Sequence, residues 1–143
     1  MPIKIFINLP VEDLKKSKAF FSHIGFSFYD DFEDDSAACM VISENIFAML
    51  LTHAKFKQFT PKAIPDGKRF TEVINCISAE SKEKVNEMVN NAMAAGGSET
   101  RESLDYGYMY GRSFNDLDGH IWEVMWMDES TNHEDSDEFC VSC

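Results

Sequence analysis

The stretch that decides the fold is INLPVEDLKKSKAFFSHIGF, residues 7–26, because it joins the end of a strand to a complete helix. The apolar run Ile3 to Leu9 predicts a strand, and Pro10 is predicted to end it because proline cannot donate to a ladder. Val11 to Ile24 predicts a helix that buries its leucine and phenylalanines and exposes its lysines to solvent. Asp13 is placed to cap its start and Gly25 to stop it.

The same order of elements occurs twice along the chain. Three more strands are predicted after the first helix, and the last of them is apolar enough to be buried on both faces: residues 26–32, 37–42 and 46–51. A long connection, residues 52–68, contains two prolines and a glycine. The pattern then restarts with a strand, a helix and three strands: residues 70–77, 81–95, 99–102, 106–115 and 121–127.

A second stretch, FNDLDGHIWEVMW at residues 114–126, predicts the closing hairpin, with its turn at Asp116 to Gly119. The closing strands of the two halves lie about 75 positions apart, which indicates an internal repeat. The expected fold is α+β and consists of two βαβββ modules, residues 1–54 and 70–128. A linker at residues 55–69 and a flexible acidic tail at residues 129–143 complete the predicted organisation.

Composition narrows the classes of partner. The 143 residues carry a net charge of −12, which argues against nucleic acid and anionic membranes. No apolar run is long enough for a membrane helix, and the start has no signal-peptide pattern, so a cytoplasmic protein is expected. Cys140 and Cys143 form a C-x-x-C pair without a second pair or a following helix, so neither a zinc site nor a thioredoxin-like site is predicted.

The two stretches, taken with the repeat, resemble the vicinal oxygen chelate superfamily, which contains glyoxalase I, bleomycin-resistance proteins, fosfomycin-resistance enzymes and extradiol dioxygenases. The resemblance covers Pro2 to about Asp128. It implies that the two sheets curl into a cup, often completed by a second chain, so a homodimer is expected. It also implies, for the metal-dependent members, ligands on four strands around an ion that acts as a Lewis acid.

The ligand positions implied by the resemblance are mostly filled by side chains that cannot bind a metal. Phe6 and Ile74 stand on the first strands of the modules, and residues 48–50 of the first closing strand are Ala, Met and Leu. Glu123 on the last strand is retained, and Glu72 is a second candidate if the register is shifted. We therefore expect a member without a metal cofactor.

The expected function is that of a metal-free small-molecule-binding member, by analogy with the bleomycin-resistance branch. Glu123 is either a polar anchor or a general base, and the candidate ligand-binding residues are Asn8, Glu72, Tyr108, Tyr110, Arg112 and Glu123. The tyrosines alternate on one predicted strand with Arg112 beyond them, and packing of that face on a helix explains the pattern equally well. Glu123 is expected to reach a pocket or to pair with a cation such as Arg112.

Two alternatives remain open. The first is a metal-dependent lyase, isomerase or dioxygenase that acts on a small substrate with vicinal oxygens and uses a divalent ion held by Glu123, Glu72 and either His53 or His120. The second is a dimer whose cup is filled by its own side chains and whose role is interaction.

Overall fold

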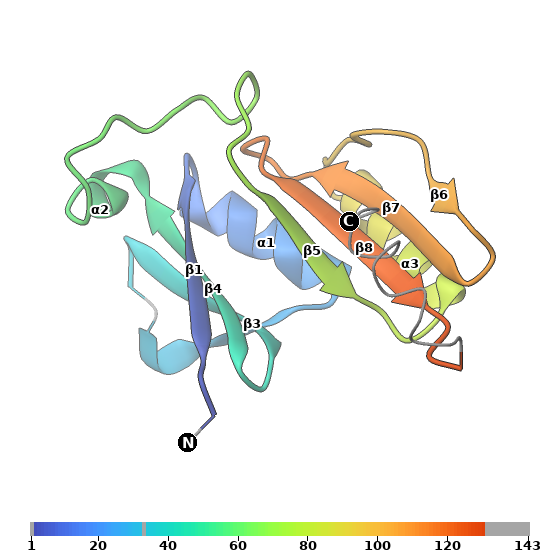
Figure 1. Cartoon of the computed structure of the whole chain (residues 1–143). Coiled ribbons are helices and arrows are strands. Elements are labelled where there is room, and N and C mark those ends of the chain that lie inside the picture. Colours follow the sequence, from blue (N-terminus) through green and yellow to red (C-terminus); the bar gives the residue numbers. More distant parts are fainter. Residues whose placement is uncertain (1, 33, 131–143) are drawn as a thin grey trace. The chain divides into compact units, whose positions relative to one another are not determined.

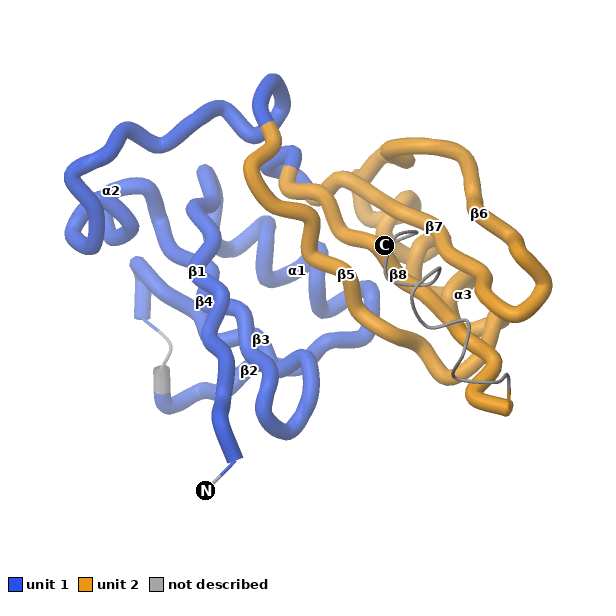
Figure 2. The backbone as a smooth tube through the Cα atoms, viewed as in Figure 1, with its two compact units in different colours: residues 1–70, 117–119 blue, residues 71–116, 120–143 orange. Residues whose placement is uncertain are grey.

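The computed structural model describes residues 2–32 and 34–130. The expected acidic tail, including Cys140 and Cys143, lies almost entirely outside the described residues. The chain divides into two compact units, shown in separate colours in Figure 2. Unit 1 contains residues 1–70 and the turn Leu117–Gly119, and unit 2 contains Thr71–Asp116 and the chain from His120 onward.

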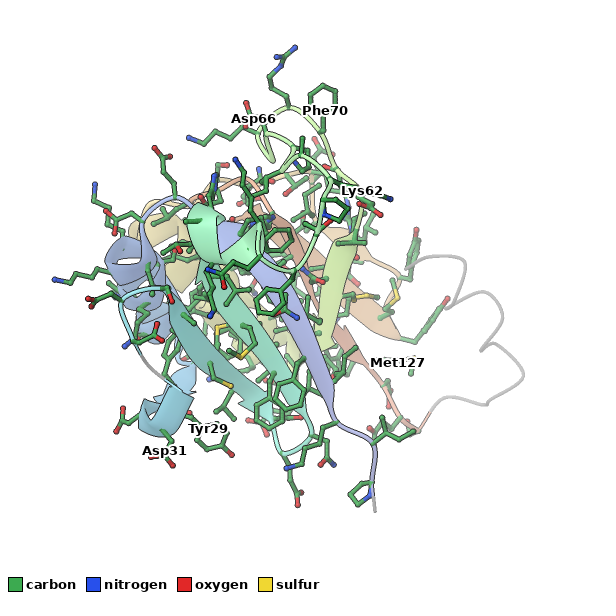
Figure 3. The ribbon with its side chains drawn as sticks, turned by 90° about the vertical axis from the view of Figure 1, so that its left-hand side faces the viewer. Tyr29, Asp31, Lys62, Asp66, Phe70 and Met127 are labelled. Atoms are coloured by element: carbon green, nitrogen blue, oxygen red, sulfur yellow. The ribbon has the colours of Figure 1, made fainter. Side chains whose placement is uncertain are left out.

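Unit 1 is a four-stranded sheet with one long helix. Its elements in chain order are β1 (Ile5–Val11), α1 (Leu14–Ile24), β2 (Ser27–Tyr29), the 3-10 turn η1 (Asp30–Phe32), β3 (Ala37–Ser43), β4 (Ile46–Thr52) and α2 (His53–Phe56). The strand order is β1-β4-β3-β2, with β1 parallel to β4 and the other pairs antiparallel. Lys62, Asp66 and Phe70 lie on the long connection that follows α2 (Figure 3).

Unit 2 repeats this plan with β5 (Ile74–Ser78), α3 (Lys82–Ala94), β6 (Leu104–Asp105), β7 (Met109–Asn115) and β8 (Ile121–Met127). The strand order is β5-β8-β7-β6, and the pair β5–β8 is the only parallel pair of the described sheet, as β1–β4 is in unit 1 (Figure 1). The α+β fold with an internal repeat is therefore confirmed.

The first helix has the predicted cap and stop but begins at Leu14 and not at Val11, and the strand before it is shifted two residues along the chain, from the predicted Ile3 to Leu9 to Ile5–Val11. The Asp13 side chain accepts a hydrogen bond from the Lys16 N–H, and Gly25 adopts a φ of 127° at the helix end. The prediction that Pro10 ends β1 is wrong, because the strand continues to Val11 with Pro10 opposite Leu51. β1 is an edge strand of its sheet, where a missing N–H donor is tolerated.

The predicted tyrosine strand begins three residues later than expected. Tyr106 and Gly107 belong to the turn between β6 and β7, where Gly107 has a φ of 81° and its N–H donates to the Asp105 side chain. The short strand expected at residues 99–102 is found instead at Leu104–Asp105. Local turn chemistry decides these boundaries, because a residue with positive φ breaks the alternation of a strand.

Each unit buries its core between its sheet and its helix. In unit 1, Phe20 and Phe21 of α1 are buried, as are Ala48 and Leu50 of β4. In unit 2, Val85 and Val89 of α3 are fully buried, together with a stacked pair, Phe114 and Trp122, whose ring centroids lie 6.4 Å apart. None of the described helices is long and apolar enough to cross a membrane.

Candidate functional site

The two faces of the unit 2 sheet have different roles. Tyr110 and Arg112 bond to Asn86 of α3, so their side of β7 faces the helix. Successive side chains alternate between faces, and residues in register share one. The helix-free face of unit 2 is therefore formed by Met109, Gly111 and Ser113 of β7, Glu123, Met125 and Met127 of β8, and Cys76 of β5.

A polar row crosses this face at the middle of β8. Ser113 lies opposite Glu123 on one side, and Cys76 lies opposite Glu123 on the other. The Glu123 side chain is only 5% exposed, and its Oε1 is 2.6 Å from an Nη atom of Arg101. Arg101 comes from the segment between α3 and β6 and is one-third exposed. The buried carboxylate thus has a cation of its own chain as partner, which offsets part of the cost of removing it from water.

Two oxygens of the row have no hydrogen-bond partner among the residues that the structure describes. Glu123 Oε2 and Ser113 Oγ are both buried, and neither makes a hydrogen bond to any group in the described part of the chain. A buried oxygen left in this state costs about 1–3 kcal/mol, so such atoms in native proteins call for an explanation. Here the two lie on neighbouring strands at one register position, where one small polar group can serve both.

The rest of the helix-free face is mostly apolar, and flexible methionine side chains form much of it. Met109 and Met125 are buried, Met127 at the end of β8 is partly exposed (Figure 3), and Leu104 of β6 lies opposite Gly111. A side-chain Cβ at Gly111 would lie 3.2 Å from Cγ of Met125, so the glycine leaves room for the thioether. Methionine side chains adapt readily to the shape of a neighbour.

The predicted residues Tyr110 and Arg112 lie on the other side of the sheet from Glu123. The Tyr110 hydroxyl is 2.7 Å from Oδ1 of Asn86, and Arg112 bonds to Asn86 and Asn90 and pairs with Glu99 at 2.7 Å. These contacts hold α3 to β7, as the helix-packing explanation of the tyrosine pattern expects. The pairing of Glu123 with Arg112 is not formed, because the two side chains point to opposite faces.

Tyr108 precedes β7, and its ring stacks on Tyr106 with centroids 6.4 Å apart. Its carbonyl accepts a hydrogen bond from the Asp128 N–H, which ties the β6–β7 turn to the end of β8. The structure therefore places Tyr108 at one end of the sheet, and not in the row that contains Glu123.

In unit 1, Asn8 lies on the face of the sheet away from α1. Lys18 of α1 lies 5.4 Å from the ring centroid of Phe28, so the side of β2 that carries Phe28 faces the helix. Asn8 is in register with Met49, which is in register with Cys39 and then Tyr29. Asn8 is exposed, and its side-chain amide donates to the Phe6 carbonyl.

Aromatic rings dominate this helix-free face of unit 1, which consists of Phe6 and Asn8 of β1, Phe47 and Met49 of β4, Cys39 of β3 and Tyr29 of β2. Phe6 stacks on the buried Phe47 at 4.8 Å between centroids, and Tyr29 lies 5.7 Å from the same ring. Figure 3 shows Tyr29 beside the 3-10 turn that contains Asp31.

The described side chains do not fit the four-ligand metal centre that the resemblance implies. Glu72 is exposed and lies before β5 begins, four residues ahead of Cys76, so an extended chain puts it about 13 Å along the sheet from the Glu123 row. Within residues 2–32 and 34–130, no group of three or more His, Cys, Asp or Glu side chains is placed to hold a metal ion. Glu123 alone, with one oxygen committed to Arg101, is a poor metal site.

Sequence reasoning did not identify Arg101 and Ser113. The sequence does contain a signal for Arg101. A buried carboxylate requires a cation as partner, and residues 71–127 contain only four Lys or Arg residues that could supply it. Two of the four, Lys82 and Lys84, lie at the start of α3. The choice between Arg101 and Arg112 depends on which face of β7 is buried under the helix, and strand alternation alone does not decide that.

Comparisons with known proteins agree with this architecture. Residues 5–43 match the family model of the bleomycin resistance protein-like N-terminal domain. No curated protein sequence matches the chain significantly.

Solved structures cover nearly the whole chain. A hypothetical protein from S. aureus has a TM-score of 0.75 and 25% identity, covering 88% of this chain and 94% of that one. A glyoxalase/bleomycin resistance protein/dioxygenase family enzyme from Burkholderia phytofirmans has a TM-score of 0.70 and 16% identity, covering 85% and 96%. A fosfomycin resistance protein from Listeria monocytogenes has a TM-score of 0.65 and 18% identity, covering 94% and 98%. The family match covers only the first part of unit 1, and the solved structures show that the chain shares their fold.

Proposed function

We propose that the protein binds a small molecule on the helix-free face of unit 2 and does so without a metal ion. The observation that carries this proposal is the state of Glu123. It stands where the resemblance implies a metal ligand, yet its charge is already balanced by Arg101 at 2.6 Å. The second oxygen of the carboxylate and the Ser113 hydroxyl are left for a ligand that forms hydrogen bonds.

Two features of this face support binding rather than packing alone. The polar atoms are few and converge on one row, and the surrounding methionines are adaptable. The names of two similar structures, a bleomycin-resistance-type enzyme and a fosfomycin resistance protein, suggest that small foreign molecules are reasonable first ligands to try.

The experiment uses methionines as reporters. The full chain, labelled with [methyl-¹³C]methionine and purified without chelators, is screened against a fragment library in the presence of EDTA. We expect hits that shift the methyl signals of Met109, Met125 and Met127 and leave those of Met40 in unit 1 and Met88 in α3 unchanged. Binding that appears only when Mn²⁺ or Zn²⁺ replaces EDTA would contradict the proposal and favour the metal-dependent enzyme.

We also propose that the chain acts as a homodimer in the cytoplasm. Large apolar side chains are exposed on and beside the two edge strands: Ile3, Ile5 and Phe6 at β1, and Phe70, Val73 and Ile74 at β5. Exposed apolar side chains on a sheet edge favour association with another chain, and the exposed Cys76 thiol suits a reducing compartment. Light scattering on the eluting protein should give twice the mass of 16.3 kDa, and a monomer at micromolar concentration would refute the dimer.

A further inference from the structure

The unpartnered oxygens of the polar row indicate what kind of molecule the proposed site takes. We infer that the ligand is a small, mostly apolar molecule with one neutral hydroxyl group, an alcohol or a phenol, which bridges Glu123 Oε2 and Ser113 Oγ. The inference rests on the proposed function and specifies its substrate class.

The charges at the row exclude most other polar groups. Arg101 already balances Glu123, so an ammonium group would add an uncompensated positive charge to a buried site. A ligand carboxylate would meet the lone pairs of Glu123 Oε2, which is an acceptor without a donor. The fitting group is therefore neutral.

The two oxygens together favour a hydroxyl, which is the smallest neutral group that both donates and accepts a hydrogen bond. Glu123 Oε2 requires a hydrogen-bond donor, and the Ser113 hydroxyl has a proton to donate. A ligand hydroxyl supplies both functions, because it donates through its proton and accepts through its oxygen. The register pairing of Ser113 with Glu123 brings the two side chains to neighbouring positions on the same face, within reach of one such group.

The surroundings set the character of the rest of the ligand. Met109, Met125 and Leu104 provide apolar surface next to the row. Arg101 covers the row from a segment that belongs to neither helix nor strand, and its side chain is one-third exposed. Movement of this one side chain, or of the segment that carries it, would admit a ligand to the carboxylate.

The test compares phenol with toluene, two molecules of similar size in which a hydroxyl replaces a methyl group. Dissociation constants are measured in EDTA from the shifts of the Met109, Met125 and Met127 methyl signals. Phenol should bind about tenfold more tightly than toluene, because toluene leaves both oxygens without a partner. Equal affinities would overturn the inference and leave the proposed function intact. An absence of shifts with both molecules would count against both proposals.

Two variants and a matched control test whether the preference for phenol over toluene arises at the polar row. Ser113→Ala should reduce the preference for phenol at least about threefold, because the phenol oxygen loses its donor. Glu123→Met should bring the preference to within about twofold while toluene still binds. Ser78→Ala, on the same face of β5 but outside the row, should leave the tenfold preference unchanged. A preference that survives both row variants means that phenol binds elsewhere, and the inference then fails.

Discussion

The helix-free faces of the two units are built on the same plan and differ in chemistry. On the helix-free face of unit 1, the second row from the β3–β4 turn contains Cys39, Met49 and Asn8. On the helix-free face of unit 2, the second row from the β7–β8 turn contains Ser113, Glu123 and Cys76. Met49 is thus the counterpart of Glu123. The unit 1 row contains a thiol, a thioether and an exposed amide, whereas the unit 2 row contains a buried ion pair and two oxygens without a hydrogen-bond partner among the described residues.

If the proposed function is correct, the repeated fold uses the helix-free face of one unit for stability and that of the other for binding. The aromatic cluster of unit 1 contributes by burial, which is non-directional and tolerant of detail. The polar row of unit 2 keeps polar atoms that a purely structural sheet would replace with apolar ones. Of the two helix-free faces, that of unit 1 should therefore give the larger effects on stability, and that of unit 2 should give the effects that distinguish binding from packing.

The largest effect is expected for Phe47→Ala. The ring is buried and contacts both Phe6 and Tyr29, so its removal should lower the free energy of unfolding by about 3–5 kcal/mol in urea denaturation. Phe59→Ala is the matched control, because Phe59 is 70% exposed on the connection and should change stability by less than about 0.5 kcal/mol. Similar losses in the two variants would show that the unit 1 cluster is not part of the core.

Arg101→Ala should come next, with a loss of about 2–4 kcal/mol, since it leaves the buried Glu123 carboxylate without its cation. The double variant Arg101→Ala with Glu123→Met converts the row toward its unit 1 counterpart and should recover most of this loss. Urea denaturation of the single and double variants measures the difference. If the double variant is no more stable than Arg101→Ala alone, the ion pair is not what Arg101 contributes. Lys62→Ala, on the connection of unit 1, serves as the control for losing a positive charge.

Ser113→Ala should have the opposite sign. The substitution removes a buried hydroxyl without a partner, so the ligand-free chain should become more stable by about 1 kcal/mol. Ser78→Ala should stay within about 0.5 kcal/mol of the parent. A destabilised Ser113→Ala variant in thermal or urea unfolding would mean that the hydroxyl is satisfied in solution.

The smallest effect concerns thiol reactivity and leaves stability unchanged. Burial raises the pKa of the Cys39 thiol, so at pH 8 a smaller fraction is ionised than in an exposed cysteine and little of the reactive thiolate is present. Cys76 is exposed and should react first with iodoacetamide in a variant with Cys140→Ser and Cys143→Ser. The Cys39 rate should rise with pH and level off only above its raised pKa. Equal rates at pH 8, followed by peptide mass spectrometry, would contradict the burial of Cys39.

The sequence predicts most of the fold because its signals are local. The Asp13 cap, the Gly25 stop and the repeated apolar closing strands each reflect short-range chemistry, and the structure contains all of them. The prediction that Pro10 ends the strand is wrong because a strand tolerates proline when it lies at the edge of a sheet. Which strand lies at the edge is a property of the whole sheet.

The candidate site is only partly predictable for the same reason. Glu123 stands out as one acid in an apolar strand, but its partner lies 22 residues away in an irregular segment. The faces of β7 look alike in sequence, and only the contacts of Asn86 and Asn90 show which one faces the helix. Contacts with α3, which is far away in the sequence, therefore place the predicted residues Tyr110 and Arg112 on the opposite face of the sheet from Glu123.

The turn Leu117–Gly119 has a consequence for how this chain can be divided. Within unit 1, Oδ1 of Asp118 accepts the Glu12 N–H at 2.8 Å, and Oδ2 lies 3.4 Å from the buried Ser17 hydroxyl. Gly67 is packed so closely on this turn that a Cβ there would lie 2.5 Å from the Asp118 carbonyl oxygen. A gene fragment that stops at residue 70 would encode four strands and the helices α1 and α2, but not the turn that completes the start of α1.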